Sequence, residues 1–199
     1  MSKTIEFYFD FGSPTAYLAH KQLKKLSDKY QVKVIYEPIL LGAVHKATNN
    51  TPPGLVPAKG RHMIMQDLPR FIKRYGVKFA MNPFFPINTL MLMRGCYAAK
   101  ELGCFEQYVD IIFDGMWVHK LNLGDIKILL NTLNKAGLDG DKLLSLTKID
   151  EIKEALKANT TKVVSKGAFG APTMYMGDEM YFGQDRIDFI EEALQHPEK

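Results

Sequence analysis

Aromatic residues at alternate positions mark the first predicted strand. Three phenylalanines alternate within residues 5–11, and such alternation is typical of a buried strand. The next residues predict a helix start, because Ser13 suits an N-cap and Pro14 suits the first helical position. Apolar residues then recur at helical spacing over residues 14–30. A strand therefore runs directly into a helix, with a hydroxyl group at the junction.

Three further strands are predicted, one near this helix and two near the other end of the chain. Residues 32–36 predict a strand that completes a right-handed βαβ unit with parallel strands. Residues 172–176 and 180–182 predict two strands joined by a tight turn at residues 177–178. A helix over residues 187–194 follows. The two ends of the chain therefore contribute a βαβ part and a ββα part.

The chain between these parts is predicted to be mostly helical from residue 61 to residue 166. The apolar spacing predicts helices over 63–75 (bent or divided at Pro69), 88–99, 105–117, 126–133, 141–147 and 150–165. Core filling is the preferred interpretation for the sulfur-containing residues of this block, although a pocket lined by some methionines stays open. These residues are Met63, Met65, Met91, Met93, Cys96, Cys104 and Met116.

A long irregular connection is predicted over residues 42–60. Three prolines and two glycines within residues 49–60 argue against a helix or a central strand there. Long loops within a domain are often functional, while a plain linker is the alternative. We expect one discontinuous domain from residues 1–41 and 167–199, with residues 42–166 inserted as a helical domain.

Composition and charge exclude several classes of function. Of the 199 residues, 46% are hydrophobic and 24% are charged, as in soluble globular proteins. A net charge of +4 is too small and scattered to indicate nucleic-acid or membrane binding. The start of the chain lacks a signal-peptide pattern, so we expect a cytoplasmic protein with reduced cysteines. The five histidines are dispersed and predict no metal site.

The order of the elements is that of a thioredoxin-like α/β fold (βαβ…ββα) with a large all-helical insertion. Four segments, residues 9–14, 50–60, 167–173 and 182–186, occur in the order found in one family. Together they resemble the kappa-class glutathione transferases and the bacterial 2-hydroxychromene-2-carboxylate isomerases. Both belong to the DsbA-type thioredoxin-like superfamily, and the resemblance covers essentially the whole chain.

The resemblance implies a catalytic role for Ser13. Disulfide oxidoreductases of this plan carry Cys-x-x-Cys where this chain has Ser13-Pro14-Thr15-Ala16, so a redox role is not expected. In the family, the serine at this position faces the thiol of bound glutathione. A hydroxyl donor at a helix N-terminus can stabilise a thiolate. The alternative is that Ser13 only caps the helix.

The resemblance also implies a backbone contact to glutathione at Ala171. The Ala171–Pro172 peptide bond is expected to be cis, with Ser13 close to it in space, and the preceding backbone to pair with the tripeptide like a strand. The turn that contains Gln184 and Asp185 is expected to hold the γ-glutamyl end, with Asp185 facing its ammonium group. An ordinary N-cap role is the alternative for Asp185.

Two residues of the proline-rich segment complete the expected glutathione site. The resemblance implies that Lys59 and Asn50 contact the glycyl carboxylate or nearby groups, whereas simple solvation is the alternative for a loop lysine. Aromatic residues that could line a substrate pocket are Tyr8, Phe11, Phe85 and Trp117, and no spacing argument selects among them.

The activity implied by the resemblance is glutathione-dependent cis–trans isomerisation in aromatic degradation. The substrate would be 2-hydroxychromene-2-carboxylate and the product trans-o-hydroxybenzylidenepyruvate, with glutathione regenerated as a cofactor. Residues 178–186 favour the isomerases, whereas residues 51–60 favour the kappa transferases, which conjugate electrophiles. A non-catalytic thioredoxin-like binding module is a further alternative. Family members form homodimers, which the resemblance extends to this chain as an expectation.

Overall fold

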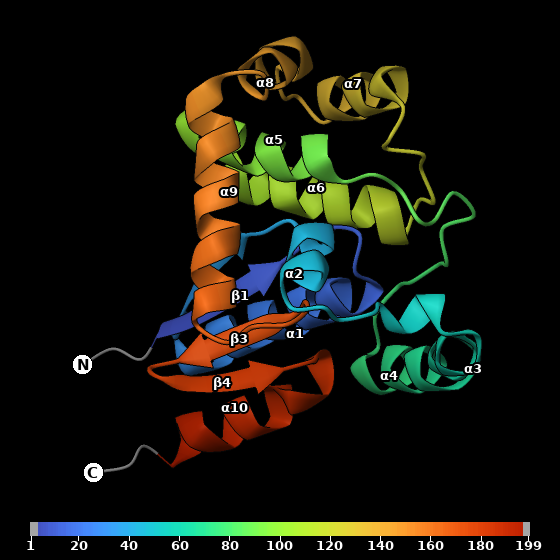
Figure 1. The fold of residues 1–199 in the computed structure, drawn as a ribbon, viewed down its shortest axis with the longest axis vertical. Coiled ribbons are helices and arrows are strands. Elements are labelled where there is room, and N and C mark those ends of the chain that lie inside the picture. The colour runs from blue at the N-terminus through green and yellow to red at the C-terminus, as the bar shows by residue number, and fades with distance from the viewer. Residues whose placement is uncertain (1–3, 197–199) are drawn as a thin grey trace.

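The fold is built on one mixed four-stranded sheet, described here for residues 4–196 of a computed structural model (Figure 1). The strands are β1 (Thr4–Phe9), β2 (Lys33–Pro38), β3 (Thr173–Met176) and β4 (Glu179–Phe182), in the order β2-β1-β3-β4. β1 pairs in parallel with β2, whereas the β1–β3 and β3–β4 pairs are antiparallel. This topology confirms the predicted thioredoxin-like α/β fold and joins the two ends of the chain.

One face of the sheet packs against α1 (Pro14–Tyr30) and α10 (Ile187–Gln195). The odd-numbered side chains of β1, Ile5, Phe7 and Phe9, are fully buried on this face, as their alternation predicts. Because β1 leads straight into α1, the start of α1 lies at the end of the central strand.

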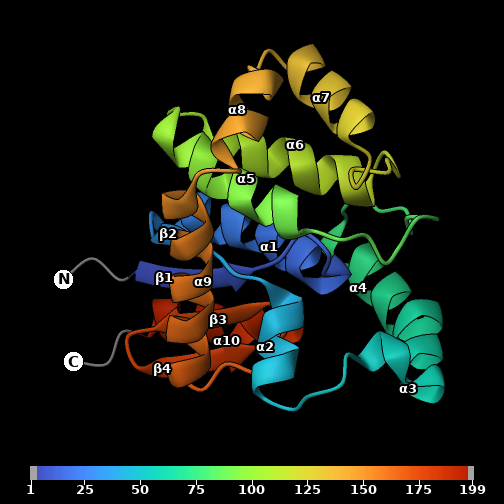
Figure 2. The same cartoon turned by 45° about the horizontal axis from the view of Figure 1, so that its top comes forward.

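The other face carries α2 (Leu41–Ala47) and α9 (Asp150–Ser165), and α9 crosses in front of the strands in Figures 1 and 2. Tyr8, which alternates with the odd-numbered residues of β1, is fully buried here with Val44 and Val163 in a second, smaller core. Helices from both ends of the inserted segment therefore help to cover the sheet.

The remaining helices of the insertion form outer layers. α5 (Leu90–Glu101) and α6 (Phe105–Trp117) pack on each other, and α6 also contacts α1. α7 (Ile126–Lys135) and α8 (Gly140–Leu146) lie beyond them, at the top of Figure 1. Every predicted helix of this block is present, so the spacing of the apolar residues predicted these helices correctly.

The prediction of an irregular connection over residues 42–60 is wrong. After α2, the chain forms the short 3-10 helix η1 (Pro53–Leu55) and then α3 (Pro57–His62). Pro53 and Pro57 begin these two helices, where the missing N–H costs no hydrogen bond, and Pro52 is the N-cap of η1. A π-helical turn, η2 (Met63–Asp67), leads into α4 (Leu68–Tyr75), so the predicted division near Pro69 is confirmed.

Both cysteines are free, and their surroundings agree with the predicted core role. Cys96 is fully buried, and this burial raises the pKa of its thiol well above the ordinary value. Met93 and Met116 are also fully buried, but Met65 is 70% exposed, so core filling is the wrong interpretation for Met65. Among residues 4–196, no helix is both long and apolar enough to cross a membrane.

Candidate active site

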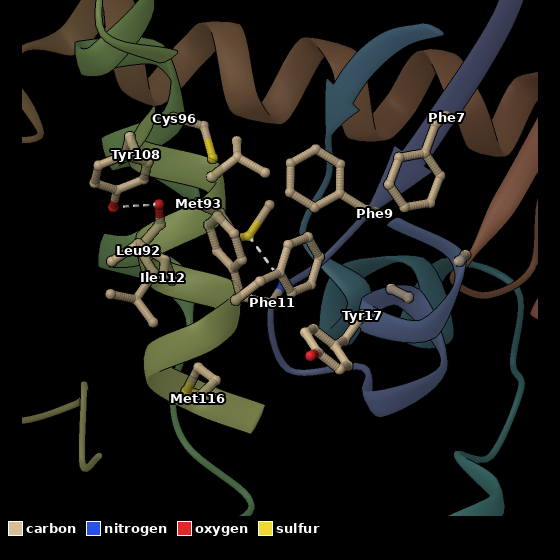
Figure 3. Close-up of a cluster of buried hydrophobic side chains, with 14 of the residues drawn as sticks. Phe7, Phe9, Phe11, Tyr17, Leu92, Met93, Cys96, Tyr108, Ile112 and Met116 are labelled. Atoms are coloured by element: carbon tan, nitrogen blue, oxygen red, sulfur yellow. Dashed lines mark hydrogen bonds between the residues drawn. The ribbon is translucent and has the colours of Figure 1, made fainter. Parts of the chain in front are cut away.

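The turn between β1 and α1 is held by side chains of the helical insertion. The backbone N–H of Phe11 donates to Sδ of Met93 at 3.4 Å, and Nε1 of Trp117 donates to the carbonyl of Phe11 at 2.8 Å. Figure 3 shows Phe9 and Phe11 packed among residues of α5 and α6, with the bond to Met93 drawn as a dashed line. The insertion therefore fixes the turn that carries Ser13.

A buried carboxylate braces the same turn from within. Asp10 is 2% exposed, and its two oxygens accept from the backbone N–H groups of Gly12 and Leu41, each at 2.8 Å. Burial raises the pKa of Asp10, while these bonds and one from the Thr89 hydroxyl oppose the rise. Sequence analysis did not select Asp10. Its signal is a single acidic residue within an aromatic run, followed by glycine at Gly12.

The hydroxyl of Ser13 makes both the cap contact and the expected long-range contact. Its oxygen accepts from the N–H of Ala16 at 3.1 Å, which makes Ser13 the N-cap of α1. The same hydroxyl donates to the carbonyl of Ala171 at 3.0 Å. Because Ser13 has one hydroxyl hydrogen, the 3.0 Å contact with Thr15 is donated by the Thr15 hydroxyl. Ser13 itself is 4% exposed.

The segment opposite Ser13 has the predicted geometry. The Ala171–Pro172 peptide bond is cis, and Ser13 lies within hydrogen-bond distance of Ala171, so both parts of this prediction are confirmed. The carbonyl of Pro172 accepts from the N–H of Gly183 at 3.0 Å. That bond brings the adjacent short helix η3 (Gln184–Arg186) beside the same segment.

The two predicted residues of η3 differ in their surroundings. Gln184 is buried, and its carbonyl accepts from the Tyr75 hydroxyl of α4 at 2.9 Å. Asp185 is partly exposed, and its Oδ2 accepts from Nη1 of Arg186 at 2.7 Å. Asp185 makes no N-cap bond to η3 or to α10, so the capping alternative is wrong. A ligand ammonium group would share this carboxylate with Arg186.

Asn50 ties the end of the α2 segment to the residues before the cis peptide bond. Its Nδ2 donates to the carbonyl of Phe169 at 3.0 Å. The ring of Phe169 meets that of Phe182, with 4.3 Å between centroids, and both rings are more than one-third exposed. A Cβ at Gly170 would stand 2.8 Å from Cε2 of Phe182 and 4.0 Å from Nε2 of His45. His45 is thus a neighbour of this segment that sequence analysis missed.

Lys59 is the predicted residue that the structure does not join to the others. Ser13, Asn50 and the residues around Pro172 are connected by hydrogen bonds across the sheet end. Lys59 is exposed on α3, and within residues 4–196 no hydrogen bond or ion pair links its side chain to that set. Figure 2 shows α3 at the edge of the molecule, next to α4.

Of the four aromatic residues considered for a substrate pocket, Phe11, Phe85 and Trp117 lie in the larger core, and Tyr8 lies apart from them. Tyr8 lies in the smaller core, on the face of the sheet opposite the cluster that contains Phe11. Trp117 is fully buried, and Phe85 packs on it with 5.7 Å between ring centroids. Among the described residues, no group of three or more His, Cys, Asp or Glu side chains could hold a metal ion.

Two backbone donors beside Ser13 remain open to a ligand. Pro14 has no N–H and Ala16 donates to Ser13, and the N–H of Thr15 in the first turn of α1 has no partner among residues 4–196. Within the part of the chain that the structure describes, the N–H of Ala171 also has no hydrogen-bond partner. The N–H of Thr15 lies at the positive end of α1, and that of Ala171 lies in the bend that precedes β3. An anion suits the first donor and a peptide carbonyl suits the second.

Comparison with known proteins places this chain in a family. Residues 4–195 match the DSBA-like thioredoxin domain. The chain is 30% identical to 2-hydroxychromene-2-carboxylate isomerase of Sphingobium xenophagum, over 98% of this chain and 99% of the relative. It is 29% identical to glutathione S-transferase kappa 1 of Caenorhabditis elegans, over 98% of this chain and 92% of the relative.

A solved structure of 2-hydroxychromene-2-carboxylate isomerase superposes with a TM-score of 0.87 at 27% identity, covering 96% of this chain and 94% of that one. Sequence and fold therefore agree over nearly the full length of these relatives. The chain belongs to the DSBA-like thioredoxin domain family. Within it, the chain belongs to the group of enzymes that comprises the 2-hydroxychromene-2-carboxylate isomerases and the kappa-class glutathione transferases.

Proposed function

We propose that the protein is a glutathione-dependent enzyme that isomerises 2-hydroxychromene-2-carboxylate to trans-o-hydroxybenzylidenepyruvate. The observation that carries the proposal is the Ser13 hydroxyl, held at the start of α1 within 3.0 Å of the Ala171 carbonyl. Similarity to the isomerases over nearly the full chain supports the reaction. Ser13 is assigned the catalytic role and remains the N-cap of α1.

The residues around Ser13 suit a sulfur anion. When bound, glutathione would supply a sulfur that adds reversibly to the conjugated double bond of the ring-opened substrate. That bond would become single, rotate and re-form as the sulfur leaves. Ser13 would turn its hydrogen from Ala171 toward that sulfur and still accept from Ala16. The unbonded N–H of Thr15 and the helix dipole favour the same negative charge.

The remaining contacts are assigned to the ends and backbone of the tripeptide. The free N–H of Ala171, before Pro172, would pair with the peptide backbone. Gln184 and Asp185 are assigned to the γ-glutamyl end. These assignments are supported by the hydrogen bond from Gly183 to Pro172, which brings η3 beside the peptide site.

The glycyl end is assigned to the segment that follows α2. Asn50 is assigned near the glycyl carboxylate, supported by its bond to the segment that precedes Ala171. Lys59 is assigned to the same carboxylate on the resemblance alone. Both residues are expected to contribute binding energy rather than to take part in the chemical step.

The proposal also covers the domain organisation, the oligomeric state and the cellular location of the protein. Residues 1–41 and 167–199 would form the thioredoxin-like domain and residues 42–166 the helical insertion. Of these, residues 1–3 and 197–199 lie outside the described residues. A homodimer is retained on the resemblance, and sedimentation would test it. A thiol cofactor and two free cysteines suit the reducing cytoplasm.

A kappa-type transferase is the second candidate, favoured by the 29% identity to the Caenorhabditis elegans enzyme. It would use the same Ser13 site but consume glutathione by conjugating it to an electrophile. A non-catalytic binding module is the third candidate, and the open donors around Ser13 weigh against it.

A parallel assay with glutathione tests these candidates. One arm follows isomerisation of 2-hydroxychromene-2-carboxylate, and the other follows conjugation of 1-chloro-2,4-dinitrobenzene. We expect isomerisation that requires glutathione without consuming it. Conjugation alone would make the protein a transferase. Absence of both activities, together with no glutathione binding by calorimetry, would leave a binding module.

A further inference from the structure

A groove runs along α5, away from Ser13. Its larger part is a cavity of about 500 Å³ between α2, α5 and α9. Its smaller part is a cavity of about 370 Å³ between the start of α5 and the segments at Gly124 and Thr147. Leu90, Arg94 and Lys153 line both cavities, so we treat them as one feature, the α5 groove. Figure 1 shows α9 and α2 in front of the sheet, with α5 above α2.

Arg94 is the unusual residue of the α5 groove. It is half-buried, its Nε is shielded from solvent without a hydrogen-bond partner, and no ion pair in residues 4–196 includes it. By contrast, Arg70, Arg74 and Arg186 each pair with an aspartate. A partly desolvated guanidinium without a partner is unfavourable. A ligand carboxylate in the groove, which Arg94 lines, would pair with the guanidinium and relieve that cost.

The end of the groove near Arg94 is cationic. Lys148 lines the smaller cavity without an ion-pair partner among the described residues. Lys153 also lines it and pairs with Asp150 at 2.7 Å. In the part of the chain that the structure describes, no acidic side chain lines this smaller cavity. The local charge therefore favours an anion.

The other end of the groove is mostly apolar. Its single acidic residue, Glu154, is neutralised by Lys157 at 3.3 Å. Apolar side chains provide most of the wall: Leu40, Ala43, Ala47, Leu156 and Val164. The groove thus joins an apolar chamber to a cationic end, and its volume is within the usual range for small-molecule sites.

We propose that the α5 groove binds a small organic carboxylate with an apolar body, its carboxylate on Arg94 and Lys148 and its body against the wall formed by α2 and α9. The proposal is independent of the glutathione site, since neither Ser13 nor Ala171 lines the groove. The volume of the groove suits a small molecule.

Calorimetric titration of the full chain with 2-naphthoate tests this, with neutral 2-naphthamide as the matched ligand. We expect 2-naphthoate to bind and 2-naphthamide to bind at least ~10-fold more weakly, as for loss of a charged hydrogen-bonding partner. Arg94→Met should weaken 2-naphthoate binding by about 10-fold or more for the same reason. The exposed Lys148→Gln should give a loss of roughly threefold, as for a partly solvated charge.

Lys135→Met, an equal charge loss at the end of α7 outside the groove, should leave the affinity unchanged. Ser13→Ala should also leave it unchanged. Equal binding of the two ligands, or full affinity in Arg94→Met, would overturn the proposal. So would loss of binding in Ser13→Ala, since the ligand would then occupy the other site. A change of sedimenting mass in Arg94→Met would assign the groove to an interface between copies instead. If Arg94→Met does not fold, Lys148→Gln decides the outcome.

Discussion

The β1–α1 turn and the α3 segment are both assigned to the glutathione site, yet they are built differently. In the turn, Asp10, Met93 and Trp117 each bond to backbone groups, and Ser13 is almost completely buried. On α3, Lys59 is exposed and no hydrogen bond or ion pair within residues 4–196 joins its side chain to the turn.

This difference separates two tasks. Stabilising a developing charge needs donors that are already oriented, since reorientation during the reaction would cost free energy. Holding a charged ligand end needs only attraction across water, which an exposed lysine supplies weakly. We therefore expect substitutions in the turn to act on turnover or stability, and substitutions on α3 to act on glutathione affinity.

The largest expected effect is on turnover in Ser13→Ala. Losing an oriented donor typically lowers the rate by ~10²-fold or more, whereas losing the cap should destabilise the fold by only about 1 kcal/mol. The measurement is glutathione-dependent turnover of a variant whose melting curve shows it folded. Ser27→Ala is the matched control, because Ser27 also bonds a backbone carbonyl, at 2.8 Å, but at the other end of α1. Near-normal turnover in Ser13→Ala would remove Ser13 from catalysis.

The next effect is on stability in Asp10→Asn. Both carboxylate oxygens of Asp10 accept backbone N–H groups, so the amide would turn a donor toward one of them. Such a mismatch should lower the free energy of unfolding by about 1–3 kcal/mol in denaturant titrations. Asp125→Asn is the control. Asp125 caps α7 through one oxygen alone, which asparagine retains. Equal losses in the two variants would show that the turn does not depend on Asp10.

The third effect is on the pH dependence of stability. It tests whether the interactions that fix the turn continue along α1, to His20. His20 is 2% exposed, with Nδ1 at 2.8 Å from the Tyr36 hydroxyl and Nε2 at 2.9 Å from Asp110. Burial lowers its pKa, and the bond to Asp110 opposes but does not cancel that shift. The folded state therefore favours neutral His20, and its contribution to stability is present above the ordinary histidine pKa of about 6.5.

As the pH falls below that value, the unfolded chain takes up the proton first, and the free energy of unfolding should drop by up to about 1.4 kcal/mol per pH unit. Denaturant titrations at pH 7.5 and 5.5 measure the drop. His20→Gln should reduce it, while His119→Gln, which changes an exposed residue, should not. A drop of the same size in His20→Gln would assign it to another group, such as His45, whose pKa burial also lowers.

The smallest effect is expected outside the turn, for Lys59→Ala and Asp185→Ala. Loss of an exposed charge contact should raise the half-saturating glutathione concentration by about two- to fivefold with little change in turnover. Glutathione saturation curves measure it. Lys73→Ala, another exposed lysine on the neighbouring helix α4, serves as the control. An unchanged half-saturating glutathione concentration in Lys59→Ala or Asp185→Ala would remove the substituted residue from the site.

The same contrast explains what could be predicted from sequence. The strands, the helices and the Ser13 junction follow from apolar periodicity and capping chemistry, which are local signals. The cis bond at Pro172 came from family resemblance rather than from its own residues. Asp10 was missed because its partners, Gly12, Leu41 and Thr89, come together only in the folded chain.

The error over residues 42–60 has a different physical origin. Composition alone treats the prolines and glycines there as helix breakers, yet a proline breaks a helix only beyond its first turn. Because Pro53 and Pro57 begin short helices, composition alone gave the wrong element. The sequence pattern therefore does not place Lys59 on a helix.

The chain has a single tryptophan, and its indole N–H is bonded to the carbonyl of Phe11, two residues before Ser13. Fluorescence excited at the red edge of the ultraviolet absorption band therefore comes from this one indole ring, which is bonded to the turn. Its ring is fully buried and stacks on Phe79, with 5.8 Å between centroids. Trp117 is thus a native spectroscopic reporter of the turn that carries Ser13, and it needs no added label.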